Sequence, residues 1–254
     1  MNSLKTIIVI PARLESTRLP RKVLADIAGK PMLWHVYQSC LQVTKASEIH
    51  VATDSELIAE IVNYWGGTVW LTDPHCASGT ERIVAILDQL DGDIIVNVQA
   101  DQPFIQRELL NQLIDIFEKS TPIPDIVTPI YSLNAEKIRD PNLVKVTCRH
   151  DNYALYFSRQ PIPYVRDIPT EQWATSTTFW GHIGIYGYRR AVLEQYHLLL
   201  PSPLEVAEKL EQLRFLQAGK SILTFVTNYI PLSVDTAADL EQARHLITSH
   251  ENNP

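Results

Sequence analysis

The stretch "IIVIPARLESTRLPRKVL", residues 7–24, joins an apolar run to a strongly basic loop. The run Ile7–Ile10 is apolar at every position, which is typical of a strand buried on both faces of a parallel sheet. Because ligands of open parallel sheets bind beyond the carboxyl ends of the strands, the loop is placed to bind an anion such as a polyphosphate. The alternative is a basic loop that meets only solvent. The cations of this loop are Arg13, Arg18, Arg21 and Lys22.

Outward from this stretch, short β-branched segments alternate with helical patterns. The expected strands are "TIIVIPA", "IHVAT", "TVWLT", "DIIVNVQA" and "DIVTPI". The expected helices are "MLWHVYQSCLQVT", "SELIAEIVNYW", "GTERIVAILDQL" and "RELLNQLIDIFEKS". Such alternation predicts an α/β fold with right-handed crossovers and a mostly parallel central sheet.

The alternation breaks down over about residues 131–201, where "VKVTCR", "YALYFSR" and "WGHIGIYGYR" resemble antiparallel strands. We expect an antiparallel β insertion that covers one edge of the α/β layer and supplies a subunit interface. The strand "ILTFVT" and a last helix then restore the alternation, with Asp235 or Thr236 as the cap of that helix. No linker or repeat is evident, so residues 1–254 are expected to form a single domain.

The composition limits the possible partners. The chain has 254 residues and a formal net charge of -7, so no overall basic field draws it to nucleic acid or to an anionic membrane. The three cysteines, Cys40, Cys76 and Cys148, lack the spacing of a disulfide framework or a zinc site. No apolar run approaches the roughly 18 residues that a membrane-spanning helix needs. We therefore expect a cytoplasmic protein with no nucleic-acid or membrane partner.

Two aspartates follow expected strands. Asp101 comes after "IIVNV", close to Gln99, and Asp235 follows "ILTFVTNYIPLSV". A single Asp after a strand is most often a turn residue. Two carboxylates at an edge that also carries a basic loop are, however, what a magnesium nucleotide needs, because acids bind the hard cation and basic groups bind the phosphates. The sequence therefore predicts a Mg²⁺-nucleotide site.

Other phosphate-binding motifs are missing. "AGKPM" lacks the Ser or Thr that follows the lysine of a P-loop, and no G-x-G-x-x-G follows the first strand. The turn "ASGTER" opens a helix at which Ser78 is a ligand contact, or at which Ser78 or Thr80 is merely the helix cap. His182 shares "WGHIGIYGYR" with Tyr186, and glycines in a strand permit the close approach of a ligand. Alone, His182 is more often a structural histidine.

Nine ordered segments resemble the 3-deoxy-manno-octulosonate cytidylyltransferases, also called CMP-Kdo synthetases. They are "IPARLESTRLPRKVL", "GKPML", "VATD", "SGTER", "VNVQADQP", "YALYFSRQPIP", "HIGIYGYR", "PSPLEVAEKLEQLR" and "VDTAADLE". They extend from about residue 7 to residue 243, nearly the whole chain. The set is specific, although "PAR...RLP.K" and "VDT..DL" occur separately across sugar nucleotidyltransferases.

The resemblance implies a Rossmann-like nucleotide-diphospho-sugar transferase fold and a nucleotidyltransferase reaction. In that reaction CTP and 3-deoxy-D-manno-octulosonate (Kdo) give pyrophosphate and CMP-Kdo, which supplies lipopolysaccharide biosynthesis. The resemblance also implies Mg²⁺ as cofactor and a homodimer whose interface lies in the insertion.

Motif positions carry the family's site residues onto this chain. Asp101 and Asp235 would bind the metal, and Arg159 would meet the sugar carboxylate. The expected catalytic residues are Asp101, Asp235, Lys22 and Arg13. The expected CTP contacts are Arg13, Lys22, Ser78 and Asp101. The expected sugar pocket consists of Gln99, Arg159, His182, Tyr186, Glu211 and Gln212.

Three positions depart from the family pattern and leave alternatives open. Arg21 and Ala100 stand in place of glycines, and Gln102 stands where a glutamate is frequent. Arg21 lacks the freedom of glycine at positive φ, so the phosphate loop is expected to change its path. One alternative function is a cytidylyltransferase for a related ulosonic acid, either an 8-amino Kdo analogue or a neuraminic-type sugar. Another is a nucleotide-binding relative without catalysis.

Overall fold

The computed structural model describes residues 4–251 and divides the chain into two compact units. Unit 1 comprises the described residues up to Ile114 and from Pro231 onward, and unit 2 is Asp115–Ile230. The first boundary falls within helix α4, Arg107–Lys119. The expected insertion at 131–201 lies inside unit 2. Its role as a separate insertion and subunit interface stays a prediction.

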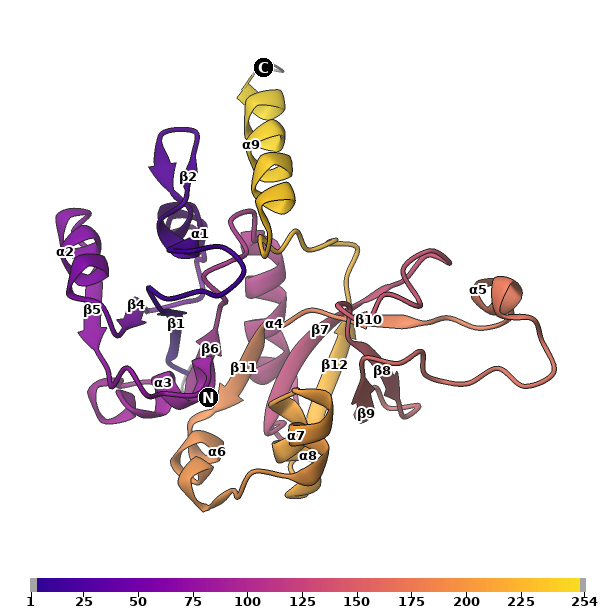
Figure 1. Ribbon diagram of the computed structural model, residues 1–254. Coiled ribbons are helices and arrows are strands. Elements are labelled where there is room, and N and C mark those ends of the chain that lie inside the picture. Colours follow the sequence, from indigo (N-terminus) through magenta and orange to yellow (C-terminus); the bar gives the residue numbers. More distant parts are fainter. Residues whose placement is uncertain (1–3, 252–254) are drawn as a thin grey trace. The chain divides into compact units, whose positions relative to one another are not determined.

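The sheet of unit 1 is parallel (Figure 1). Each neighbouring pair of its strands runs in the same direction, and β1 is buried along its whole length. The strand order is β5 (Thr68–Leu71), β4 (Glu48–Thr53), β1 (Thr6–Ala12) and β6 (Ile94–Asn97). The expected strands and the mostly parallel sheet are confirmed. The apolar runs of β1 and β6 are explained by burial on both faces, whereas β5 at the edge of the sheet is partly exposed.

Helices connect these strands as the alternation predicted. Ser55 caps the helix after β4, because its side chain accepts a hydrogen bond from Ile58 N. The helices of this region are α1 (Met32–Leu41), α2 (Glu56–Tyr64) and α3 (Gly79–Val84). Short 3₁₀ turns are η1 (Lys22–Leu24) and η2 (Leu87–Gln89), and β2 (Asp26–Ile27) pairs antiparallel with β3 (Lys30–Pro31).

The C-terminal segment returns to unit 1 through helix α9, Ala237–Glu251. Thr236 caps this helix, since its Oγ1 accepts a hydrogen bond of 3.3 Å from Asp239 N. The cap is therefore Thr236, and the carboxylate of Asp235 is left for other contacts. The segment is anchored by a buried cluster of Ile27, Met32, Val234, Leu240 and Ala243.

Unit 2 contains the antiparallel strands that the sequence predicted. Strand β7, Ile126–Ser132, pairs in parallel with β12, Ile222–Val226. It pairs antiparallel with β10 (Trp180–His182) and with β11 (Tyr186–Arg189). Strand β10 pairs antiparallel with β8 (Lys145–Cys148), which pairs antiparallel with β9 (Ala154–Ser158). The first two expected antiparallel segments are therefore confirmed, whereas the third is divided into β10 and β11, so His182 and Tyr186 lie on different strands.

The helices of unit 2 are short. They are α5 (Trp173–Ser176), α6 (Arg190–Glu194), α7 (Pro203–Glu208) and α8 (Gln212–Gln217), with the 3₁₀ turns η3 (Thr170–Gln172) and η4 (Tyr196–Leu198). Figure 1 shows α5 at the end of the long connection that joins β9 to β10. Between residues 4 and 251, no helix has the length and apolar character that crossing a membrane requires.

Candidate active site

Lys22 joins two aspartates that come from distant parts of the chain. Its Nζ lies 2.7 Å from Asp101 Oδ2 and 2.9 Å from Asp235 Oδ1. Burial disfavours the charge of Lys22, but the attraction and hydrogen bonds of the two carboxylates outweigh it and raise the pKa of the ammonium group. The predicted convergence of a basic loop and two carboxylates therefore exists within unit 1.

Local structure explains how these three groups meet. Lys22 begins the 3₁₀ turn η1, and Asp101 lies in the turn that follows β6. Val234 is fully buried, and its backbone N–H donates a 2.9 Å hydrogen bond to Asp101 O. Because Asp235 is the next residue, this contact brings its carboxylate beside Asp101.

Two carboxylates that converge on one ammonium group also suit one divalent cation. Oδ1 of Asp101 and Oδ2 of Asp235 make no hydrogen bond within the part of the chain that the structure describes. Mg²⁺ is commonly held by one or two protein carboxylates together with water and substrate phosphates. No group of three or more His, Cys, Asp or Glu residues that could hold a metal occurs among the described residues. The two carboxylate oxygens without hydrogen bonds fit a metal that takes its remaining ligands from water and substrate phosphates.

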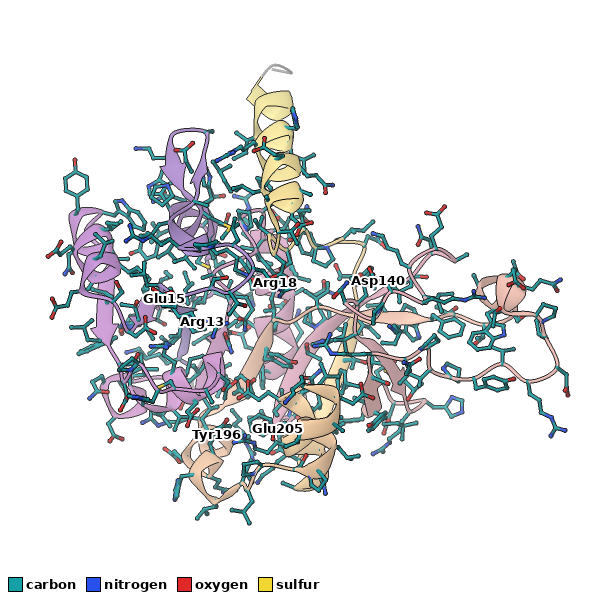
Figure 2. The ribbon with its side chains drawn as sticks, in the orientation of Figure 1. Arg13, Glu15, Arg18, Asp140, Tyr196 and Glu205 are labelled. Atoms are coloured by element: carbon teal, nitrogen blue, oxygen red, sulfur yellow. The ribbon has the colours of Figure 1, made fainter. Side chains whose placement is uncertain are left out.

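A cavity of about 220 Å³ lies beside this ion-pair cluster. Three segments line it: the loop after β1, the turn that opens α3 and the turn after β6. Arg13 and Arg18, labelled in Figure 2, both belong to the first of these segments. The predicted residues that line the cavity are Arg13, Lys22, Ser78, Gln99 and Asp101.

Ser78 caps helix α3. Its Oγ accepts a 3.1 Å hydrogen bond from Glu81 N, and Glu81 Oε2 accepts one from Ala77 N. At Gly79 a Cβ atom would lie 3.0 Å from Pro11 Cγ, so glycine permits the close approach of this turn to β1. The interpretation of Ser78 as the helix cap is therefore confirmed. Its contact with CTP stays a prediction.

Arg82 and Asp54 form a buried ion pair that sequence reasoning did not single out. Arg82 Nη2 lies 2.9 Å from Asp54 Oδ2, and the side chains are 4% and 15% exposed. Asp54 Oδ1 also accepts a hydrogen bond from Leu14 N, which fixes the start of the basic loop. Arg82 lines the cavity. The signal was present, because "VATD" and "SGTER" each contain one member of the pair.

The remaining residues of the basic loop differ in their contacts. Arg18 Nη2 lies 2.9 Å from Asp235 Oδ1, and its side chain is 60% exposed. Arg21 has φ 51° and ψ 36°, so it adopts the left-handed conformation that glycine takes without strain. Ala100 and Gln102 are buried, and Gln102 Oε1 makes no hydrogen bond within the described residues.

In unit 2, backbone carbonyl groups surround the guanidinium group of Arg159. Its Nε donates to Glu208 O at 2.8 Å, and Nη1 donates to Pro141 O at 3.0 Å. The buried ammonium group of Lys145 donates to the carbonyl oxygen of Arg159 itself. Within the described residues Arg159 forms no ion pair with a carboxylate. Its charge is therefore not neutralised by a side-chain acid in this part of the chain, and its contact with a sugar carboxylate stays a prediction.

His182 and Tyr186 are in contact, with ring centroids 5.2 Å apart. Burial lowers the pKa of His182 to about 3, so its imidazole is neutral near pH 7. Burial and the nearby charge of Glu211 raise the pKa of Tyr186 well above its ordinary value. Glu211 also accepts a 3.0 Å hydrogen bond from the hydroxyl of Tyr196, and Gln212 is buried at the start of α8. The membership of these residues and of Gln99 in one sugar pocket stays a prediction.

Comparison with known proteins gives a consistent result. Residues 7–222 match the family model described as "Cytidylyltransferase". The 3-deoxy-manno-octulosonate cytidylyltransferase of Chlorobium chlorochromatii (strain CaD3) is 42% identical over 246 residues, which cover 96% of this chain and 97% of that protein. The enzyme of the same name from Escherichia coli is 41% identical over 243 residues, which cover 96% of each.

A solved structure also resembles this protein along nearly its whole length. It is the CMP:2-keto-3-deoxy-manno-octonic acid synthetase complexed with CTP, with 40% sequence identity and a TM-score of 0.91. The match covers 97% of this chain and 99% of that one. The chain therefore belongs to the 3-deoxy-manno-octulosonate cytidylyltransferase family.

Proposed function

We propose that the protein transfers CMP from CTP to the anomeric hydroxyl of Kdo, giving CMP-Kdo and pyrophosphate and so activating Kdo for lipopolysaccharide biosynthesis. The observation that carries this proposal is the contact of Lys22 with both Asp101 and Asp235 beside a cavity. Arg13 and Ser78 line the same cavity. Relatives that are 42% and 41% identical bear the name of this activity.

The reaction places demands that these residues can meet. The sugar oxygen attacks the α-phosphorus in line with the departing pyrophosphate, and negative charge grows on the leaving oxygens. Arg13 and Lys22 stabilise that charge, and no covalent enzyme intermediate is needed. In unit 2, Arg159 is a partner for the sugar carboxylate, because its charge is not paired with an acid among the described residues.

Mg²⁺ is the divalent ion that we propose for Asp101 and Asp235. When bound with the nucleotide it supplies neutralisation of phosphate charge. Mn²⁺ serves as a spectroscopic substitute in a test that does not depend on turnover. We expect electron paramagnetic resonance titration with CTP to show binding to the wild-type protein and weaker binding to Asp101→Asn and Asp235→Asn. Equal affinity in all three proteins would exclude these carboxylates as ligands.

The decisive experiment measures pyrophosphate release. The protein is incubated with CTP, Mg²⁺ and one sugar at a time: Kdo, its 8-amino analogue or a neuraminic acid. We expect turnover with Kdo and none after chelation of the metal. Turnover with only another sugar would instead support the related ulosonic-acid specificity. No turnover with any of the three, while CTP still binds, would support a non-catalytic nucleotide-binding role.

Two further properties belong to this proposal. We expect a homodimer formed through the 131–201 region, where Leu155 and Tyr164 expose 59% and 76% of their surface. Light scattering at micromolar concentration tests it, and a monomer would contradict it. We also expect cytoplasmic action, because Cys40, Cys76 and Cys148 are free thiols. Localisation by cell fractionation tests the compartment.

A further inference from the structure

The imidazole of His182 is held in one orientation. Its ring contacts Phe157 edge to face, with centroids 5.0 Å apart, and Tyr186 at 5.2 Å. Its backbone N–H donates a 2.8 Å hydrogen bond to Val144 O. Because the ring is confined by its neighbours, the hydrogen bonds of its two nitrogens decide what it offers to a ligand.

Thr128 determines the protonation of one of those nitrogens. This residue lies on β7, is fully buried, and places Oγ1 3.0 Å from His182 Nε2. Oγ1 also lies 2.8 Å from Ile185 O and 3.2 Å from Ile183 O. Two oxygens at 2.8 Å need a proton between them, and a carbonyl oxygen carries none. The single hydroxyl proton is therefore donated to a carbonyl, so Thr128 accepts a hydrogen bond from Nε2–H of His182.

Backbone pairing explains why Thr128 donates in this direction. Strand β11 pairs with residues 126–127 of β7, and strand β10 pairs with residues 130–132 of β7. Residues 183–185, which connect β10 to β11, lie outside both strands. Pro129 has no N–H to donate at this point. The hydroxyl of Thr128 supplies a donor to Ile185 O, which would otherwise lose a partner. The tautomer of His182 thus follows from a backbone requirement.

We infer that Thr128 is a positioning residue that fixes His182 as the Nε2–H tautomer, so that Nδ1 is a permanent acceptor selecting a hydrogen-bond donor on the acidic sugar. This inference rests on the proposed function for its ligand, but the tautomer itself does not. Within the described residues, Nδ1 makes no hydrogen bond. A sugar hydroxyl or an ammonium group can donate to it, whereas a fluorine or a methoxy group in the same place has no proton to give.

The tautomer is tested without substrate by ¹⁵N NMR of the histidine side chains, which distinguishes protonated from unprotonated ring nitrogens. His182 is assigned from the spectrum of His182→Gln. We expect Nε2–H in the wild-type protein and in Thr128→Ser, which keeps the hydroxyl. In Thr128→Val we expect a shift toward Nδ1–H or a mixture. A wild-type protein with Nδ1–H, or an unchanged spectrum in Thr128→Val, would overturn the inference.

Thr224→Val is the matched control. Thr224 is the register partner of Thr128 on β12, is 2% exposed, and donates a 2.7 Å hydrogen bond to Asn152 O. Within the described residues its hydroxyl contacts Asn152 O and Cys148 Sγ and makes no hydrogen bond with the ring of His182. Both valine variants lose a buried hydroxyl that donates a hydrogen bond to a backbone carbonyl oxygen. Both are therefore expected to unfold at a lower urea concentration than the wild-type protein. Only Thr128→Val is expected to change the His182 spectrum.

Kinetics tests the role in sugar selection. For Thr128→Val we expect the KM for the sugar to rise about tenfold while the KM for CTP stays unchanged, and Thr128→Ser to recover the wild-type value. We also expect this measurement to extend to sugars in which each hydroxyl is replaced in turn by fluorine. One of these sugars should have a much higher KM than the parent sugar with the wild-type protein, and the difference in KM should be smaller with Thr128→Val. A parallel rise in both KM values would reduce Thr128 to a structural role. Absence of turnover in the wild-type protein would reject the proposed function, while the NMR result would still decide the tautomer.

Discussion

Lys22 Nζ lies 2.7 Å from Asp101 Oδ2, and their side chains are only 14% and 22% exposed. Removing one member of such a pair leaves the other charge in a partly buried place, which is costly. The same carboxylate is the proposed metal ligand, so a bound metal would share this acidic site with the ammonium group of Lys22. The first substitutions to test therefore remove the charge of one of these side chains.

Replacing Asp101 by Asn keeps the side-chain shape and removes the negative charge. We expect kcat to fall by roughly 10²- to 10³-fold, because both the metal and Lys22 lose a charged partner. Pyrophosphate release measures the effect, and circular dichroism checks the fold. Asp91→Asn is the control, since the Asp91 side chain is 97% exposed. Turnover of Asp101→Asn equal to that of the control would remove Asp101 from the mechanism.

Lys22 and Arg18 both contact Asp235 Oδ1, at the same distance of 2.9 Å, but they differ in burial. We expect Lys22→Gln to raise the KM for CTP by about tenfold or more, since a charge-assisted contact in a partly buried site is lost. Arg18→Gln should change it by less than about threefold, because an exposed pair is screened. Steady-state kinetics with varied CTP measures both. Equal effects would show that burial does not separate the two cations.

Arg159→Lys keeps the positive charge and removes the planar set of guanidinium N–H donors. We expect the KM for the sugar to rise by roughly 10- to 100-fold with the KM for CTP unchanged. Some loss of stability should accompany it, because Glu208 O and Pro141 O lose donors. Arg149→Lys is the control, as its exposed guanidinium pairs with Asp151 at the surface. An unchanged sugar KM would place the carboxylate elsewhere.

His182 makes folding stability depend on pH. Its pKa is about 3 in the folded protein against an ordinary value of 6.5, so between these values the unfolded chain binds a proton that the folded chain does not. This contribution is complete above about pH 6.5 and is lost as the pH falls toward about 3. We expect His182→Gln to lose less stability than the wild type between about pH 7 and about pH 4.5, measured by urea unfolding.

The control for this pH series is His75→Gln, because the His75 side chain is 93% exposed. It should follow the wild-type dependence closely. A difference between wild type and His182→Gln that does not change with pH would contradict the burial of a neutral imidazole.

Arg21→Gly tests the left-handed residue of the basic loop. With φ 51°, a side chain at this position costs about 1 kcal/mol, part of which the larger unfolded-state entropy of glycine offsets. We expect the free energy of unfolding to rise by up to about 1 kcal/mol. Arg21→Ala is the matched control, since it removes the charge and keeps the Cβ atom. A gain of stability in both variants would show that the effect comes from the loss of the Arg21 charge.

The sequence determined the α/β framework because the local pattern of apolar residues decides which segments are buried. Continuous apolar runs such as Ile7–Ile10 predicted the buried strand β1, and the change of pattern after residue 131 predicted the antiparallel strands. The basic loop and Asp101 were predictable for the same reason, since each directly follows such a run. Their chemistry depends on residue type and on position at the end of a strand.

Only the tertiary structure decided which side chains meet. Lys22 and Asp235 are 213 positions apart, and their contact depends on the burial of Val234 and its hydrogen bond to Asp101. The cap of α9 was open between two residues until the packing assigned it to Thr236. Nothing in the pattern around Thr128 indicated that it sets the tautomer of His182, 54 positions away. Local periodicity encodes which residues are buried, whereas the partner of each polar group is fixed by long-range packing.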